Sequence, residues 1–162
     1  MKTLFRITLA LLVTLTWVGC DNNEEDPGTG DDPSAIYGTW LSAGDNVAPG
    51  FEAFGITEIE AIFNEDGSYV VNATTGVGPF QQTGTYTTSA TSEGEIRSIR
   101  LEQSTPTQLV AEGIYEVDGT TMRYEVLDTS QGTPATPAGG FGSSIAGDAD
   151  PGTWTQVYVR QQ

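Results

Sequence analysis

Side chains that could do covalent or metal chemistry are scarce in this sequence. It has no histidine and a single cysteine, Cys20, and its only lysine is Lys2. Beyond Cys20 this composition excludes Ser-His-Asp triads, Cys-His pairs, Schiff-base lysines, disulfides, and zinc or copper sites built on histidine or cysteine. Carboxylates, tyrosines and hydroxyls remain. The composition therefore favours a binding protein without a cofactor over an enzyme.

Carboxylates are abundant, and such groups can support a glycoside hydrolase or hold calcium. A glycosidase needs two acids facing each other across a sugar site, and no pair of acids stands out at a strand end inside an aromatic cleft. Asp148-Ala149-Asp150, with Asp128 or Asp45, could supply oxygen ligands to Ca²⁺, but EF-hand spacing is absent. We expect no metal site, and a carboxylate-based hydrolase is the weakest of the functional alternatives.

Tyrosines are the second chemically useful group. Each joins an apolar ring to a hydroxyl that needs a partner when it is buried. Four of the six tyrosines, with one phenylalanine and one methionine, fall where strand alternation points them toward one interior. We expect a pocket for a small hydrophobic or aromatic ligand, lined by Phe63, Tyr69, Tyr86, Tyr115, Met122 and Tyr124. The alternative is that such side chains fill the interior and leave no pocket.

Net charge excludes two classes of partner. All 22 acidic residues follow Cys20, against four arginines, which gives this part of the chain a net charge of −18. Such a surface repels nucleic acid and anionic lipid head groups. Arg100 and Arg123 could bind a ligand carboxylate inside the fold, although arginines on strands more often pair with acids across the sheet. The acids available for such pairs are Glu102, Glu112 and Glu125.

The elements that must position these side chains are β-strands. Helical periodicity is almost absent, whereas alternation with a period of two recurs between turns, including the hairpin signals Asp66-Gly67 and Asp118-Gly119. We expect strands over residues 36–42, 57–64, 68–74, 80–88, 95–103, 108–117, 120–127 and 153–161. Eight such strands predict an all-β domain, an antiparallel up-and-down meander barrel, with a two-sheet β-sandwich as the alternative. Two long links, 43–56 and 130–152, could each cover an open end of the barrel.

Alternation also predicts which residues face the interior. On the second strand Ile59, Ala61 and Phe63 face inward because the residues between them include two glutamates. The last strand is ambiguous, with Gln156 and Tyr158 on one face and two valines on the other. Applied to the remaining strands, the rule adds Val71, Ala73, Ile99, Leu101, Leu109, Ala111 and Val126.

The start of the chain has the features of a signal peptide. Two basic residues precede an apolar run over residues 7–18, which is too short to span a bilayer. The run ends at Gly19-Cys20, which resembles the lipobox of bacterial lipoproteins, with Trp17 where the family usually has leucine. In that family the signal is cleaved before the cysteine. The resemblance implies a signal peptide over residues 1–19 and membrane attachment through acyl chains on Cys20.

Two further segments follow the signal. Residues 20–34 are acidic and contain no large apolar side chain, so we expect a disordered tether, and residues 35–162 suit one domain. The acidic stretch 21–26 resembles the signal that exports some Gram-negative lipoproteins to the outer face. We therefore expect an outer-membrane lipoprotein of the bacterial cell envelope, on either its periplasmic or its surface-exposed side.

Short motifs of the domain resemble the lipocalin-like (calycin) barrels of bacterial lipoproteins. They are Gly38-Thr39-Trp40, Phe63-Asn64-Glu65-Asp66-Gly67-Ser68-Tyr69 and Gly84-Thr85-Tyr86. In lipocalins an arginine near the end of the last strand packs across the first-strand tryptophan and closes the barrel. This implies that Arg160 lies over Trp40, near Gly38. The Thr-Asp-Tyr motif and the C-terminal helix of many lipocalins are missing from this sequence.

The expected function follows from the expected location in the cell envelope and from the barrel together. The chain is interpreted as a lipid-anchored envelope protein whose barrel binds a small apolar ligand. The alternative is a protein-interaction module, an inhibitor or accessory subunit, with a filled barrel.

Overall fold

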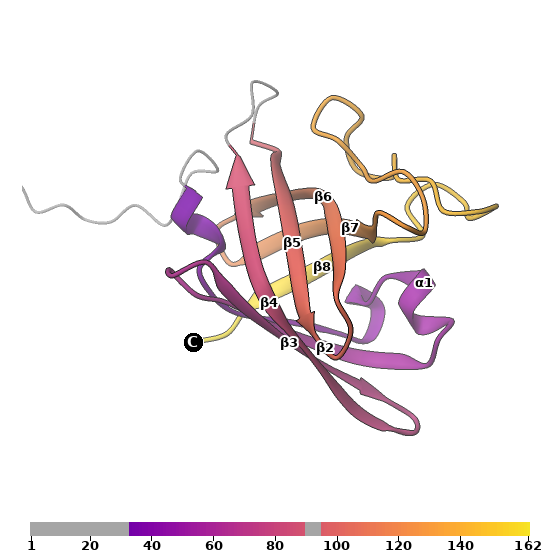
Figure 1. Cartoon of the computed structure of the whole chain (residues 1–162), viewed down its shortest axis with the longest axis horizontal. Coiled ribbons are helices and arrows are strands. Elements are labelled where there is room, and N and C mark those ends of the chain that lie inside the picture. The colour runs from indigo at the N-terminus through magenta and orange to yellow at the C-terminus, as the bar shows by residue number, and fades with distance from the viewer. Residues whose placement is uncertain (1–32, 90–94) are drawn as a thin grey trace, which may run out of the picture.

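Eight β-strands pair in sequence order, and the last returns to the first, in a computed structural model that describes residues 33–89 and 95–162 (Figure 1). Every pair is antiparallel. The strands are Gly38–Ala43 (β1), Ile56–Phe63 (β2), Ser68–Thr75 (β3), Gly78–Ser89 (β4), Arg97–Thr105 (β5), Leu109–Asp118 (β6), Thr121–Asp128 (β7) and Thr155–Arg160 (β8). The predicted up-and-down barrel is confirmed, and the sandwich alternative is wrong.

The first strand begins two residues later than expected, because the chain directly before it is helical and not extended. Residues Pro33–Ile36 form a short 3₁₀ helix (η1) instead of extending the strand. The Ile36 side chain is fully buried, and its carbonyl accepts a 2.7 Å hydrogen bond from Trp40 Nε1. The signal segment, Cys20 and all but the last two residues of the tether lie outside the described residues. In the part of the chain that is described, no helix is both long and apolar enough to span a bilayer.

Arg160 closes the end of the barrel at which β1 begins. Its guanidinium carbon lies 4.1 Å from the ring centroid of Trp40, which is fully buried. Its two terminal nitrogens donate to the carbonyls of Tyr37 (2.6 Å) and Ala35 (2.5 Å). Gly38 has a φ of +117°, and a Cβ there would lie 3.0 Å from Arg160 Nη1. The structure thus brings Gly38, Trp40 and Arg160 together at what we term the closed end.

The opposite end carries the longer connections. The link after β1 contains a 3₁₀ turn, Gly44–Asn46 (η2), and one short helix, Pro49–Glu52 (α1). Gly50 N donates a 2.9 Å hydrogen bond to Thr153 O, and a Cβ on Gly50 would lie only 2.5 Å from the Trp154 ring. The Trp154 ring also meets Phe51 edge to face at 5.6 Å. These contacts join α1 to the start of β8, whereas η1 and the C-terminus lie at the closed end (Figure 1).

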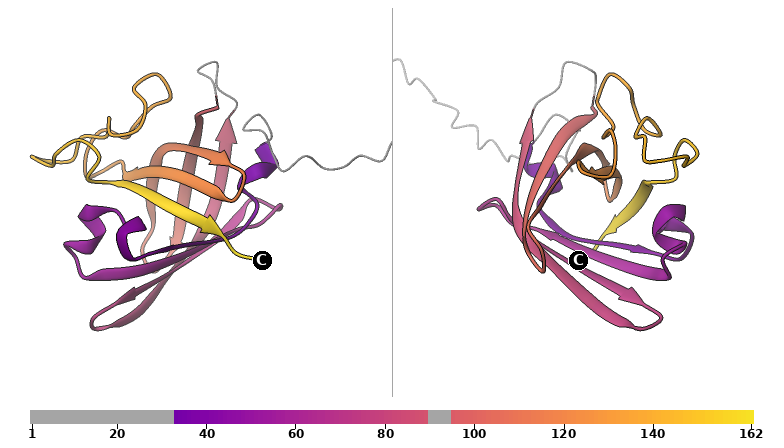
Figure 2. Two further views of the ribbon diagram at one scale, coloured as in Figure 1. Left: turned by 180° about the vertical axis from the view of Figure 1, so that it is seen from behind. Right: turned by 45° about the vertical axis from the view of Figure 1, so that its right-hand side comes forward.

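The long segment 130–152 lies largely outside the barrel (Figures 1 and 2). Ile114 on β6 and Glu125 on β7 are register partners on the outer face of the sheet, yet both side chains are fully buried. The Glu125 carboxylate accepts hydrogen bonds from Ser144 N (2.9 Å), the Thr155 hydroxyl (2.7 Å) and Gly142 N. The segment is therefore held to the wall of the barrel by a carboxylate that alternation alone would place in water.

Candidate ligand cavity

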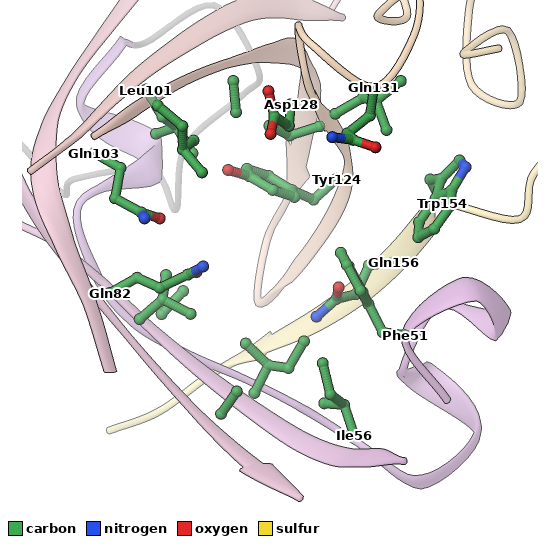
Figure 3. Close-up of a pocket in the computed structure, with 18 of the residues that line it drawn as sticks. Phe51, Ile56, Gln82, Leu101, Gln103, Tyr124, Asp128, Gln131, Trp154 and Gln156 are labelled. Carbon is green, nitrogen blue, oxygen red and sulfur yellow. The ribbon is translucent and has the colours of Figure 1, made fainter. Parts of the chain in front are cut away.

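A cavity of about 680 Å³ opens at the end of the barrel that carries α1 (Figure 3). This volume lies within the range of about 300–1,000 Å³ that is usual for small-molecule sites. Inward-facing residues of the strands provide most of its wall, as the alternation of the sequence predicts. Apolar residues that line it include Ile56, Ile59, Val71, Leu101, Leu109 and Val126. Phe51 lines it from α1, and Trp154 lines it from the position directly before β8.

A layer of aromatic rings separates this cavity from the core at the closed end. Phe63 lies 6.5 Å from Tyr69 and 6.3 Å from Tyr124, measured between ring centroids. Tyr124 in turn meets Tyr158 edge to face at 5.7 Å. All four rings line the cavity. They form a floor that is apolar apart from its hydroxyl groups.

Three of the expected pocket residues do not line the cavity. Tyr86, Tyr115 and Met122 are buried on the other side of the aromatic layer, in the core at the closed end. Each lies in the half of its strand that is nearer the closed end. The Tyr86 hydroxyl donates to Asn64 O at 2.8 Å. Alternation gives the side of the sheet on which a residue lies but not its depth along the barrel axis. The expected pocket is therefore corrected to Phe63, Tyr69 and Tyr124 plus residues nearer the mouth.

Glutamine amides are the main polar groups that the sequence analysis missed. Gln82 and Gln103 line one side of the cavity, and Gln156 faces them from β8 (Figure 3). The Gln103 amide donates to Thr107 O at 2.8 Å. The Gln156 side chain is 1 % exposed, and its Nε2 makes no well-formed hydrogen bond among the described residues, although the side chain is close enough to the Tyr158 hydroxyl to moderate the rise in its pKa. Each glutamine is an even number of positions from a buried residue on the same strand: Gln82 from Tyr86, Gln103 from Leu101 and Gln156 from Tyr158. This spacing is the signal that could have identified all three as inward-facing.

Burial keeps the cavity tyrosines in their neutral form. It raises the pKa of Tyr69 to about 12. It also raises the pKa values of Tyr124 and Tyr158 well above the ordinary value for tyrosine, because a buried phenolate would lose its hydration. Near neutral pH all three hydroxyls therefore remain uncharged and able to donate hydrogen bonds.

Asp128 is the only charged side chain among the described residues that line the cavity. It sits at the rim, and one of its oxygens accepts hydrogen bonds from the backbone N–H and the hydroxyl of Ser130, both at 2.8 Å. No arginine lines the cavity within the described ranges. The site is therefore apolar, rich in amide and hydroxyl groups, and weakly acidic at its opening.

The arginines considered for ligand binding lie on the outer face. Arg100 forms ion pairs with Glu102 at 3.2 Å and with Glu112, two of the expected partners. Arg123 lies 3.8 Å from Glu116 and 4.1 Å from the ring centroid of Phe141, so Glu125 is not its partner. Burial of Glu125 by the long segment explains this difference.

The acidic residues considered for calcium do not assemble into a site. Among the described residues, no group of three or more acidic, cysteine or histidine side chains is placed to hold a metal ion.

Comparisons of the chain with protein-family models, curated proteins and solved structures found no significant match. The candidate site is therefore defined by its own geometry.

Proposed function

We propose that this protein is a lipid-anchored binding protein of the bacterial cell envelope whose barrel holds a small hydrophobic or aromatic ligand. The observation that carries the proposal is the cavity of about 680 Å³, with a largely apolar wall, at the end of the barrel that carries α1. A wall built mainly from apolar side chains offers many dispersion contacts to a ligand of matching size and shape.

The surroundings of the mouth support the same proposal. Phe54 and Phe80 line the cavity and remain partly exposed, at 74 % and 39 %. Exposed aromatic side chains at an opening offer an apolar path from solvent to the interior. The alternative of an interaction module with a filled barrel receives less support, because the interior is hollow on the side of the mouth.

The anchoring part of the proposal rests on the lipobox resemblance of Gly19-Cys20 and on the acidic segment that follows it. An acidic chain cannot hold an anionic membrane by charge, so attachment requires acyl chains. One chain gives only marginal binding, whereas two or more give stable anchoring. We place the protein at the outer membrane, on its periplasmic or its surface side.

Native mass spectrometry tests the binding function. The chain from Asp21 onward retains every strand pair and every core residue of the barrel. After incubation with a lipid extract of the envelope and repurification, it should carry an additional mass of a few hundred daltons, released by organic solvent. A barrel that remains empty after exposure to an envelope lipid extract, and that binds no apolar dye, would contradict the proposed function.

A further inference from the structure

The charges of the cavity discriminate between classes of ligand. Within the described ranges Asp128 is the only acidic or basic side chain that lines the cavity, and burial keeps the phenols of its floor neutral. The described arginines all lie elsewhere, Arg97 and Arg160 toward the closed end and Arg100 and Arg123 on the outer face. An anionic head group that enters the cavity would therefore lose its hydration without meeting a cation, which is strongly unfavourable.

The polar groups of the wall instead suit an uncharged ligand that has an acceptor atom. Gln156 Nε2 is a buried donor that makes no well-formed hydrogen bond among the described residues, although its side chain lies near enough to the Tyr158 hydroxyl to moderate the rise in the pKa of that phenol. Figure 3 shows the amide directed into the cavity. A buried polar group that lacks a partner is costly, and a ligand that supplies the acceptor removes that cost. Gln82 and Gln103 offer further neutral amides on the opposite wall.

We infer that the cavity selects uncharged amphiphiles bearing a carbonyl-type acceptor over anionic amphiphiles of the same size, with the Gln156 amide donating to that acceptor. This inference rests on the proposed ligand-binding function and adds the chemical class of the ligand. It places fatty acids and other carboxylates outside the preferred class. Ketones, quinone-like rings, esters and amides of matching size fall within it.

A pair of dyes that differ by one sulfonate tests the charge preference. N-phenyl-1-naphthylamine is uncharged, and 1-anilinonaphthalene-8-sulfonate has the same ring system with an anionic group added. Both become fluorescent in an apolar site. The chain from Asp21 onward should bind the uncharged dye at least about 10-fold more tightly, a difference of about 1.4 kcal/mol.

High salt distinguishes the effect of the cavity on dye binding from the effect of the net charge of the whole molecule. In about 1 M sodium chloride the Debye length falls to about 3 Å, so repulsion by the acidic surface is largely screened. The preference for the uncharged dye should persist there, because an unpaired anion inside the cavity is screened much less. Equal or tighter binding of the sulfonate in high salt would overturn the inference while leaving the proposed function intact. Failure of both dyes to bind would overturn the proposed function and this inference with it.

The role of Gln156 has its own test. Gln156→Leu should weaken binding of the uncharged ketone 6-propionyl-2-(dimethylamino)naphthalene by about 3- to 10-fold, the usual worth of one hydrogen bond. Binding of N-phenyl-1-naphthylamine, which has no carbonyl, should change little. The matched control is Gln81→Leu, because Gln81 lies on the outer face and bonds to Asn72 there at 2.8 Å.

The folded state of the variant can be checked independently. Removing an unpaired buried amide should leave the melting temperature of the Gln156→Leu protein unchanged or raised. If that variant does not fold, Gln156→Met provides a second apolar replacement of similar length. Unchanged ketone binding in a folded variant would overturn the role assigned to Gln156.

Discussion

At the scale of single residues, the Arg160 side chain links parts of the chain that are far apart in the sequence. It covers the Trp40 ring and binds two carbonyls of the segment that precedes β1. One guanidinium thus joins the last strand to the first strand and to η1. The planar group provides both donors and a face for the indole, which an ammonium cannot reproduce.

Replacing this residue should destabilise the barrel. Arg160→Ala removes a cation–π contact and two charge-assisted hydrogen bonds, with an expected cost of about 2–4 kcal/mol. Arg160→Lys should recover only part of the loss. Urea unfolding curves of the three proteins measure the difference. A cost below about 1 kcal/mol for the alanine variant would contradict this role, since surface substitutions typically fall within about 0.5 kcal/mol.

The alternation of residues in the sequence predicted correctly which side chains face the interior of the barrel. It did not predict how far along the barrel axis each of them lies. Alternation placed Phe63, Tyr69 and Tyr124 inside, where they border the cavity. It placed Tyr86 and Met122 inside as well, but nothing in a period of two distinguishes the closed end from the mouth. Depth depends on strand stagger and on which end is plugged, and both arise only once the barrel closes.

At the scale of elements, the long segment 130–152 shows how a loop can be fixed without regular structure. Its composition suggested only a cover for an open end, because the buried partner that holds it, Glu125, belongs to a different element. Burial alone would raise the pKa of Glu125, but hydrogen bonds from Gly142, Ser144 and Thr155 outweigh burial and lower it. The ionised carboxylate is therefore the form that binds the segment.

Acidification should release this segment. Because the pKa of Glu125 in the folded protein lies below its ordinary value of 4.5, its contribution to stability is complete above that pH and is lost as pH falls through the folded-state pKa. At pH 7, Glu125→Gln should cost about 1–3 kcal/mol, because the amide can accept fewer of the three hydrogen bonds. Melting temperatures of both proteins, measured from pH 7 down to about 3, should converge at the acidic end.

Limited proteolysis supplies a second measure of the same change. Cleavage within residues 130–152 should be faster in the Glu125→Gln protein than in the parent at neutral pH. The matched control is Glu58→Gln, at an exposed position of β2, which should alter neither cleavage nor melting. Equal cleavage rates in the Glu125 variant and the control would contradict the assigned contact.

At the scale of the whole molecule, attachment and binding are assigned to separate parts of the chain. The barrel lies within residues 33–162, and the proposed anchor is Cys20. Cys20→Ala should therefore release the protein from membranes without changing its melting temperature or its dye binding. Membrane fractionation measures the first effect, and high-salt washing of the parent protein should fail to extract it. Unchanged fractionation of the variant would contradict lipid anchoring.

The chain enters and leaves the barrel at the end plugged by Arg160, with η1 and the C-terminus on the side opposite α1 (Figure 1). A sensor chip, bead or fusion partner coupled through either terminus would therefore leave the cavity open to bulk solution. Immobilised in this way, the protein could be screened against compound libraries without its support blocking the mouth. The same layout makes Phe54 and Ala146, which line the cavity from the two long links, natural positions for variation if the barrel is engineered to hold other molecules.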